Sequence, residues 1–328
     1  MPVSINGSVG DSGGQNRPED VRTVYALFNK ILSTQLAVGD ECSAELIAAI
    51  RDFQSAFMSR PDGRIDAGGR TWRELIAAAA NPNPGGGGTE VPAESGGEIN
   101  VGGAGAAWTA RHQWNDGYEM EFSRWVEQLF ADKKGSLAAC LRNPAGNTLY
   151  SDEDRNLSIH CDCADLPYLL RAYFSYKKRL PFSFNASISG GRYTSNNQPG
   201  SRSSFLDYSG FADMARAISN SVHSGFYRFL WSTEKTDTYL CQVNRDSIVP
   251  GTIYYDANGH LLVVSRVDDD GTVWFVDAHP DNSLTNKRFG AHLSRGYCTQ
   301  GSGFRLWREQ KVSGGGSFTL TSNANSRF

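Results

Sequence analysis

The sequence predicts an α+β protein built from two domains. Its helical patterns come first, and its strand patterns gather near the end, an order that favours segregated helices and sheet. A Gly- and Pro-rich stretch separates a short first part from a longer second part. The 328 residues, 39% of them hydrophobic, have a globular composition and a length that suits two domains.

Residues 1–80 are predicted to form a small three-helix domain. Apolar residues recur at helical spacing after Pro18, again after the capping residue Ser43, and a third time from about Arg70. Residues 81–106 are predicted to be a flexible linker, because they are rich in Gly and Pro and carry little to bury.

Residues 107–312 are predicted to form the larger domain, followed by a disordered tail over 313–328. A long polar loop is expected over 182–204. The predicted helices are 114–130, 165–178 and 211–230, and the predicted strands are 252–255, 260–267 and 272–276.

Composition excludes several function classes. Lys plus Arg number 32 and Asp plus Glu 35, for a net charge of -3, so we expect no nucleic-acid partner. No apolar run approaches the ~20 residues of a membrane helix, so no membrane partner is expected. The first residues lack the basic and apolar regions of a Sec signal.

Cysteine usage predicts neither a disulfide scaffold nor a metal site. The chain has 6 cysteines, too few for a disulfide framework. Only Cys161 and Cys163 are close together, and no second pair accompanies them, so we predict no structural zinc and no cofactor. Whether Cys161 forms a disulfide after export stays open.

Cys163 is the candidate nucleophile. It lies at the start of the helix predicted over 165–178. Free backbone N–H groups at the first turn of a helix favour a thiolate, so this position suits a reactive cysteine. Such a cysteine also needs a base, usually His, and a third group that fixes the tautomer of that base.

A predicted hairpin supplies the base and its partner. His260 begins one strand and Asp277 ends the next. A four-residue loop would place His260 opposite His279 with Asp277 as its diagonal neighbour, and a two-residue loop would place His260 opposite Asp277. Both registers keep His260 and Asp277 on one face, whereas an odd-length loop would not. His279 remains an alternative third member.

The first domain resembles a known wall-binding family. The helix residues Ala49-Ile50-Arg51-Asp52-Phe53-Gln54 are followed by PDGRIDAGGRTWREL at 61–75. This order resembles peptidoglycan-binding domains of the three-helix type, and it covers nearly all of residues 1–80. The resemblance implies that the first domain binds peptidoglycan.

The second domain resembles papain-fold enzymes. The chain order Cys163, His260, Asp277 is that of the transglutaminase-like and NlpC-like groups, and Asp162-Cys163-Ala164 is similar to the "DCS" start of NlpC-like wall peptidases. The strand before Gly259-His260 is also similar to theirs. The segment 182–248 matches neither group, so the substrate stays open.

These resemblances imply a cysteine peptidase or amidase acting on peptidoglycan peptides. Cys163 would attack the carbonyl, His260 would carry the proton, and Asp277 would orient the imidazole. The alternatives are a transglutaminase-like acyltransferase and a non-catalytic wall-binding protein.

Action on the wall without a Sec signal implies another route out of the cytoplasm, to the periplasm or cell wall. A type VI secretion effector with antibacterial activity would use a secretion apparatus and would have an immunity protein as partner. A phage-type lysin released on lysis is the other possibility.

Overall fold

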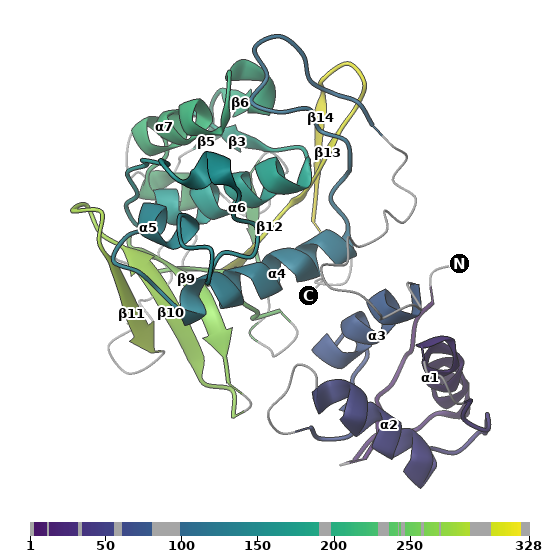
Figure 1. Ribbon diagram of the computed structural model, residues 1–328. Helices are drawn as coiled ribbons and strands as arrows, with labels where there is room; N and C mark the ends of the chain where they lie inside the picture. The colour runs from purple at the N-terminus through teal and green to yellow at the C-terminus, as the bar shows by residue number, and fades with distance from the viewer. Residues whose placement is uncertain are drawn as a thin grey trace. The chain divides into compact units, whose positions relative to one another are not determined.

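The chain divides into two compact units, Met1–Pro92 and Ala93–Phe328 (Figure 1). The predicted linker falls at this division, and its residues 81–98 lie outside the described residues. The computed structural model describes residues 3–11, 13–31, 35–55, 61–80, 99–189, 198–228, 236–241, 243, 247–256, 259–268, 270–288 and 303–322.

The described residues of the first unit form three helices, at the places that the sequence predicts. A short pairing of two strands accompanies them, which the sequence analysis did not predict. Apolar residues of all three helices share one core, with Val21, Phe28, Ile50 and Leu75 fully buried or nearly so. The elements are α1 (Pro18–Ile31), α2 (Ala44–Ser55), α3 (Arg70–Ala80), β1 (Val9–Gly10) and β2 (Arg64–Ile65).

The motif of the first unit has a structural basis. The buried amide of Gln54 donates to Asp62 Oδ1 at 2.7 Å, to the Arg64 carbonyl at 2.9 Å and to Thr71 Oγ1 at 3.0 Å. Its oxygen accepts from the Gly63 N–H at 2.8 Å. One side chain therefore holds the Pro61–Asp66 turn against α2 and α3, which explains why glutamine stands at this place.

The second unit is a mixture of helices and an antiparallel sheet, so the predicted α+β class is confirmed at this level. The six-stranded sheet has the order β11-β10-β9-β8-β12-β7. Its strands are β7 (Thr238–Leu240), β8 (Ile253–Tyr255), β9 (Leu261–Val267), β10 (Val273–Ala278), β11 (Leu284–Arg288) and β12 (Gly303–Trp307). The helices are α4 (Asp116–Ala131), α5 (Leu137–Leu141), α6 (Asp165–Lys178) and α7 (Phe211–Ser221).

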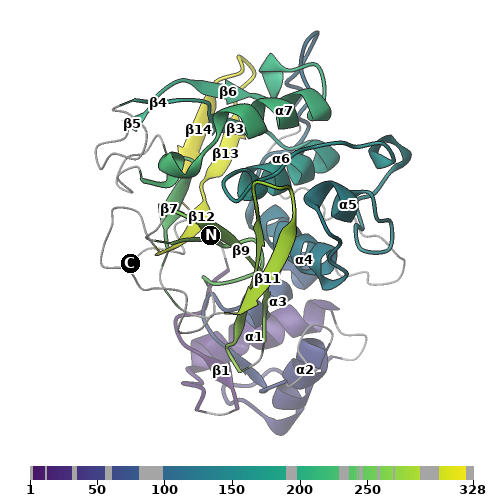
Figure 2. The ribbon, with the colours of Figure 1, turned by 90° about the vertical axis from the view of Figure 1, so that its left-hand side faces the viewer.

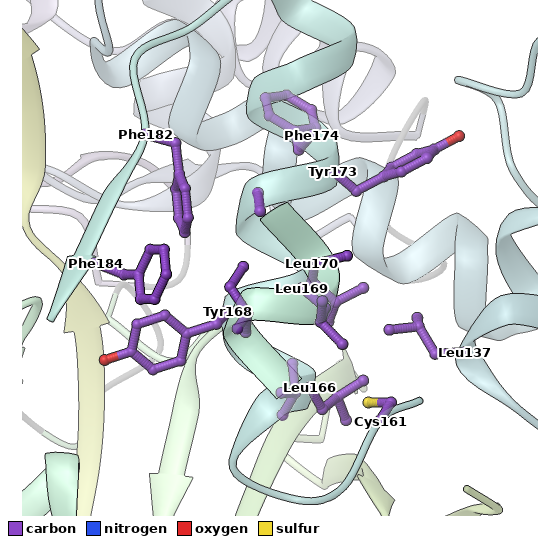
Figure 3. Packing of buried hydrophobic residues seen from close by; sticks show 14 of the residues in the cluster. Leu137, Cys161, Leu166, Tyr168, Leu169, Leu170, Tyr173, Phe174, Phe182 and Phe184 are labelled. Carbon is purple, nitrogen blue, oxygen red and sulfur yellow. The ribbon is translucent and has the colours of Figure 1, made fainter. Parts of the chain in front are cut away.

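Helix α6 forms the centre of the second unit. It contacts α4, α7 and β9, and every residue from Asp165 to Ser175 is buried. Aromatic side chains surround it, with Tyr168 facing Phe184 on one side, as Figure 3 shows. The bounds of α6 match the prediction. Pro167 is tolerated because it lies in the first turn, and Arg179 ends the helix in the left-handed conformation (φ 54°).

Two predicted elements differ from the structure. The helix predicted over 211–230 ends at Ser221, whose hydroxyl donates to the Ala217 carbonyl, and a 3-10 turn over Ser224–Arg228 follows. In the loop predicted over 182–204, the described residues form four short strands, with β3 paired to β6 and β4 paired to β5; residues 190–197 lie outside the described part. These are β3 (Ser183–Asn185), β4 (Ile188–Ser189), β5 (Gln198–Pro199) and β6 (Arg202–Ser204).

Both predicted ends of the second domain need correction. The linker is predicted to include residues 99–106, but Val101 is buried and forms an isolated antiparallel β-bridge with Ala110. This pairing joins residues 99–106 to the second unit. The predicted disordered tail contains β14 (Phe318–Thr321), which pairs with β13 (Glu309–Val312) beside β3 in Figure 2. The ring of Phe318 contacts the buried Phe205, so apolar contact orders this stretch. The last six residues lie outside the described part.

Across the described residues, no helix is both long and apolar enough to cross a bilayer.

Candidate active site

The first turn of α6 is capped by Asp162. Its Oδ1 accepts from the N–H groups of Ala164 at 2.8 Å and Asp165 at 3.1 Å, while its own N–H donates to Asp165 Oδ2 at 3.1 Å. Asp162 and Asp165 therefore bind each other's backbone N–H reciprocally, in the turn that leads from Asp162 into α6. The expectation of free N–H groups at this helix start is therefore wrong for Ala164 and Asp165. The N–H of Cys163 has no acceptor within the described residues.

The two neighbouring cysteines lie in different surroundings. Cys163 is half-buried and borders the apolar core. Cys161 precedes the helix and is only 1% exposed, and Figure 3 shows its sulfur at the Leu166 end of α6. Burial, followed by the charges of Asp165 and Asp162, raises the pKa of the Cys161 thiol well above its ordinary value. Only Cys163 is therefore open to a substrate.

The hairpin of β9 and β10 has the predicted register near His260 and Asp277, but its loop length differs from both predicted lengths. Its loop has five residues, an odd number, because Val273 pairs with Val267. A β-bulge then follows, since Trp274 pairs with Arg266 but Phe275 pairs with Val264. The extra residue, Ser265, restores the register expected from a four-residue loop.

His260 lies near both of its expected partners. Its Nε2 lies 2.8 Å from Asp277 Oδ2, and the Cys163 thiol is close enough to affect its pKa. Because Asp277 occupies Nε2, Nδ1 is the nitrogen left for the sulfur. The hydrogen bond to Asp277 and then the neighbouring Cys163 raise the pKa of His260 to about 9, against burial, which lowers it. An imidazolium is therefore stable beside the sulfur.

Two residues that the sequence analysis missed complete the surroundings of Asp277. Thr285 and Lys287 extend from β11, where Asp277 pairs with Thr285. The Thr285 hydroxyl donates to Oδ1, and the Lys287 ammonium donates to Oδ2. Burial alone would raise the pKa of Asp277, but bonds from His260, Lys287 and Thr285 hold it well below its usual value. The carboxylate stays charged although its side chain is 0% exposed.

His279, the alternative third member, does not take the place of Asp277. Its ring lies beside that of His260, with centroids 6.0 Å apart. Its Nε2 lies 3.1 Å from Thr285 Oγ1 and 3.5 Å from Asp277 Oδ2. It therefore adds a further titratable group to the Asp277 cluster, while the hydrogen bond to His260 Nε2 belongs to Asp277.

The turn after β10 fixes the hairpin to the segment that precedes the nucleophile. Asn282 Oδ1 accepts from the Cys161 N–H at 3.0 Å, and His160 Nε2 lies 3.1 Å from the Pro280 carbonyl oxygen. Asn282 has a positive φ of 65°, which asparagine tolerates well. These two contacts position the start of α6 against the strand ends that carry His260 and Asp277.

Two buried polar groups near the sulfur were not predicted. Asp165 Oδ1 and the Tyr227 hydroxyl have no hydrogen-bond partner within the described residues. Burial, and then the charge of Asp162, raises the pKa of Asp165 to about 8. Burial, with smaller effects from neighbouring charges that include Cys163, raises the pKa of Tyr227 well above its usual value. Burial therefore favours the neutral form of both groups.

The arrangement can activate a thiol for attack on a carbonyl. A sulfur at a helix start lies near an imidazole, and a buried carboxylate hydrogen-bonds one nitrogen of that ring; these are the three parts that nucleophilic cysteine chemistry requires. The described residues include no group of three or more His, Cys, Asp or Glu arranged to hold a metal ion.

Comparison with known proteins adds no relative: no family model matches the chain, and no curated protein or solved structure matches it.

Proposed function

We propose that the second unit is a cysteine hydrolase that cleaves amide bonds in the peptides of bacterial cell wall. The observation that carries the proposal is the 2.8 Å hydrogen bond between His260 and Asp277, with Cys163 near enough to the same imidazole to affect its pKa. Thr285 and Lys287 support it by keeping the carboxylate charged and in place.

The first step forms a thioester. The Cys163 proton passes to Nδ1 of His260, and the sulfur attacks the carbonyl carbon of the scissile bond. The imidazolium then gives that proton to the leaving amine as the C–N bond breaks. The backbone N–H of Cys163 is a donor available to the oxyanion that forms in this step.

The second step releases the acid. Water attacks the thioester carbonyl while His260 Nδ1 accepts a proton, and the sulfur leaves as the C–S bond breaks. Asp277 does not change its protonation in either step; it keeps the imidazole in one tautomer and orientation and stabilises its charged form. An amine that replaced water would make the same site an acyltransferase.

The wall as substrate rests on the motif in the first unit. Residues 49–54 and 61–75 resemble three-helix peptidoglycan-binding domains, and a binding unit tethered to an enzyme raises the local concentration of substrate. Export by a non-Sec route and a partner immunity protein remain predictions of the same proposal.

The direct test is incubation of the full chain with purified sacculi, followed by mass spectrometry of the soluble products. We expect released muropeptides with new free carboxyl and amino ends. Products that carry an added amine donor and have lost ammonia would instead indicate acyl transfer.

Two cysteine variants make the test specific. Cys163→Ala should lose at least about 10³-fold in rate, because the thioester cannot form. Cys161→Ala is the matched control, two residues away and buried, and should retain the parent rate per folded molecule. Equal rates for Cys163→Ala and the parent chain would disprove the hydrolase proposal.

A further inference from the structure

A hollow of about 200 Å³ lies between the segment before the nucleophile and helix α7. One wall comprises Ser158, Ile159 and His160. The other wall is one face of α7, because residues three and four positions apart share a face of a helix. These α7 residues are Arg216, Ser219 and Asn220.

The two walls are held together. The Ser219 hydroxyl donates to the His160 carbonyl at 2.6 Å, and the His160 ring contacts the Pro280 carbonyl oxygen. Helices α6 and α7 also pack side by side (Figures 1 and 2). These contacts join the two walls of the hollow.

The lining has the chemistry of a carboxylate site. Its lining residues include Arg216, Asn220 and Ser158, whose side chains carry a guanidinium, an amide and a hydroxyl, and none of the six lining residues is an acid. The ion pair between Arg216 and Asp213 is 3.4 Å long and exposed on both sides. Pairs of this kind contribute little, so the guanidinium can exchange Asp213 for a substrate carboxylate, to which it offers two parallel donors.

The chain that joins the hollow to the nucleophile is short. His160, on its wall, is three residues from Cys163, and three extended residues span at most about 11 Å. A peptide whose scissile carbonyl lies at the Cys163 sulfur would place a group one to three residues away at the hollow.

We propose that this hollow, through Arg216, binds a carboxylate of the peptide substrate one to three residues from the scissile bond. The inference rests on the proposed hydrolase function and adds the substrate class: anionic peptides, with amidated forms of the same peptides bound more weakly.

The test measures binding without chemistry. The full chain carrying Cys163→Ala is titrated by calorimetry with the tetrapeptide L-Ala-γ-D-Glu-diaminopimelate-D-Ala, and with the same peptide in which every carboxylate is a carboxamide. We expect Arg216→Gln to weaken binding of the acid peptide about tenfold, the effect of losing one charge-assisted hydrogen-bonded pair. Arg216→Lys should recover part of the loss, because it keeps the charge but not the planar pair of donors.

Arg155→Gln is the matched control. Arg155 is equally exposed and forms an i,i+3 ion pair with Asp152, so the net charge changes by the same amount outside the hollow. The Arg155→Gln variant should bind both peptides with the affinity of the chain that retains Arg155. The inference is overturned if Arg216→Gln binds the acid peptide as tightly as the parent, or if Arg216→Gln weakens both peptides equally.

Failure of the proposed function gives a different result. If only the hydrolase proposal is wrong, the parent chain, which retains Cys163, leaves the acid peptide uncleaved. The difference in binding between Arg216→Gln and Arg155→Gln still persists. If the hollow alone is wrong, cleavage remains and that difference disappears. In the active chain we expect Arg216→Gln to raise KM about tenfold with little change in kcat.

Discussion

The two sides of the candidate site differ in charge. The helix side, at the start of α6, holds two carboxyl groups, Asp162 and Asp165, beside Cys163. The sheet side gathers His260 and Lys287 around the single carboxylate of Asp277. Both Asp165 and Asp277 are buried, yet their pKa values move in opposite directions, up to about 8 and well below the usual value.

If the proposed hydrolase function is correct, the difference predicts where activation of the sulfur comes from. On the helix side Asp162 already accepts two of the first N–H groups of α6, so the helix end has little positive potential left for a thiolate. The sheet side provides an imidazole whose pKa is raised to about 9. The proposed function therefore predicts that a charged His260, more than the helix dipole, activates the sulfur.

The largest expected effect comes from removing the charge of Asp277. Asp277→Asn should lower kcat/KM about 10²- to 10⁴-fold, because the amide keeps the shape but neither fixes the tautomer nor stabilises the imidazolium. The measurement is the rate of muropeptide release. Asp270→Asn, in the turn at the other end of the hairpin, is the control and should change the rate less than twofold.

The pH dependence tests the imidazolium directly. The pKa of His260 is raised to about 9, so the imidazolium should persist through neutral pH and be lost as pH rises through about 9. Activity should fall over that range, and the stability that the charged ring contributes, fully present below about 6.5, should fall with it. A pH–rate profile that already declines at pH 7 would contradict this.

Removing the ammonium of Lys287 should sharpen the comparison. In the parent chain Lys287 shares Asp277 Oδ2 with His260, so its charge offsets part of the carboxylate's effect on the ring. Lys287→Met should therefore raise the pKa of His260 and move the alkaline limit of activity up by about 0.5–1 pH unit. An NMR titration of the His260 ring measures the shift directly.

Two further variants make the Lys287 result interpretable. Lys287→Arg keeps the charge and should leave the alkaline limit of activity in place. If Lys287 had only a structural role, Lys287→Met would lower stability without moving that limit. His279→Gln removes the other titratable group that faces Asp277 and separates its contribution. A downward shift in Lys287→Met would contradict the assigned sign.

The smallest effect is expected from Asp165→Asn on the helix side. Burial raises the pKa of Asp165 to about 8, so the folded protein binds more protons than the unfolded chain between about pH 4 and 8. Stability should fall with pH across this range, by at most about 1.4 kcal/mol per pH unit. Asp165→Asn should remove that fall while changing activity at pH 6 little. Urea unfolding at pH 5 and pH 8 measures the change of unfolding free energy with pH. An equal change in the parent and Asp165→Asn chains would contradict the assignment.

Much of the site was predictable because its main elements have local signals. The bounds of α6 follow from its apolar pattern and its proline, and the strand alternation placed His260 and Asp277 on one face. The capping by Asp162 could also have been predicted, since Asp162 and Asp165 have the spacing of a capping box.

The rest depends on contacts that leave no local signal. The bulge at Ser265 offsets the register change that an odd-length loop produces, and no residue type at that position predicts a bulge. Strand β11 buries only Leu284 and is otherwise polar, so it lacks the alternation that identifies a strand. Lys287 and Thr285 were missed for this reason. The β14 pairing was missed because polar residues after Val312 resembled a tail.

The measurement that tests the account most directly is the alkylation rate of Cys163 by iodoacetamide at pH 6, followed by peptide mass spectrometry. A free thiol, with a pKa of ~8.5, is almost entirely protonated there. We predict that Cys163 in the parent chain reacts at least about tenfold faster than free cysteine, that Cys161 stays unlabelled, and that His260→Ala removes the enhancement. Equal labelling of Cys163 in the parent and His260→Ala chains would show that the imidazole does not activate the sulfur.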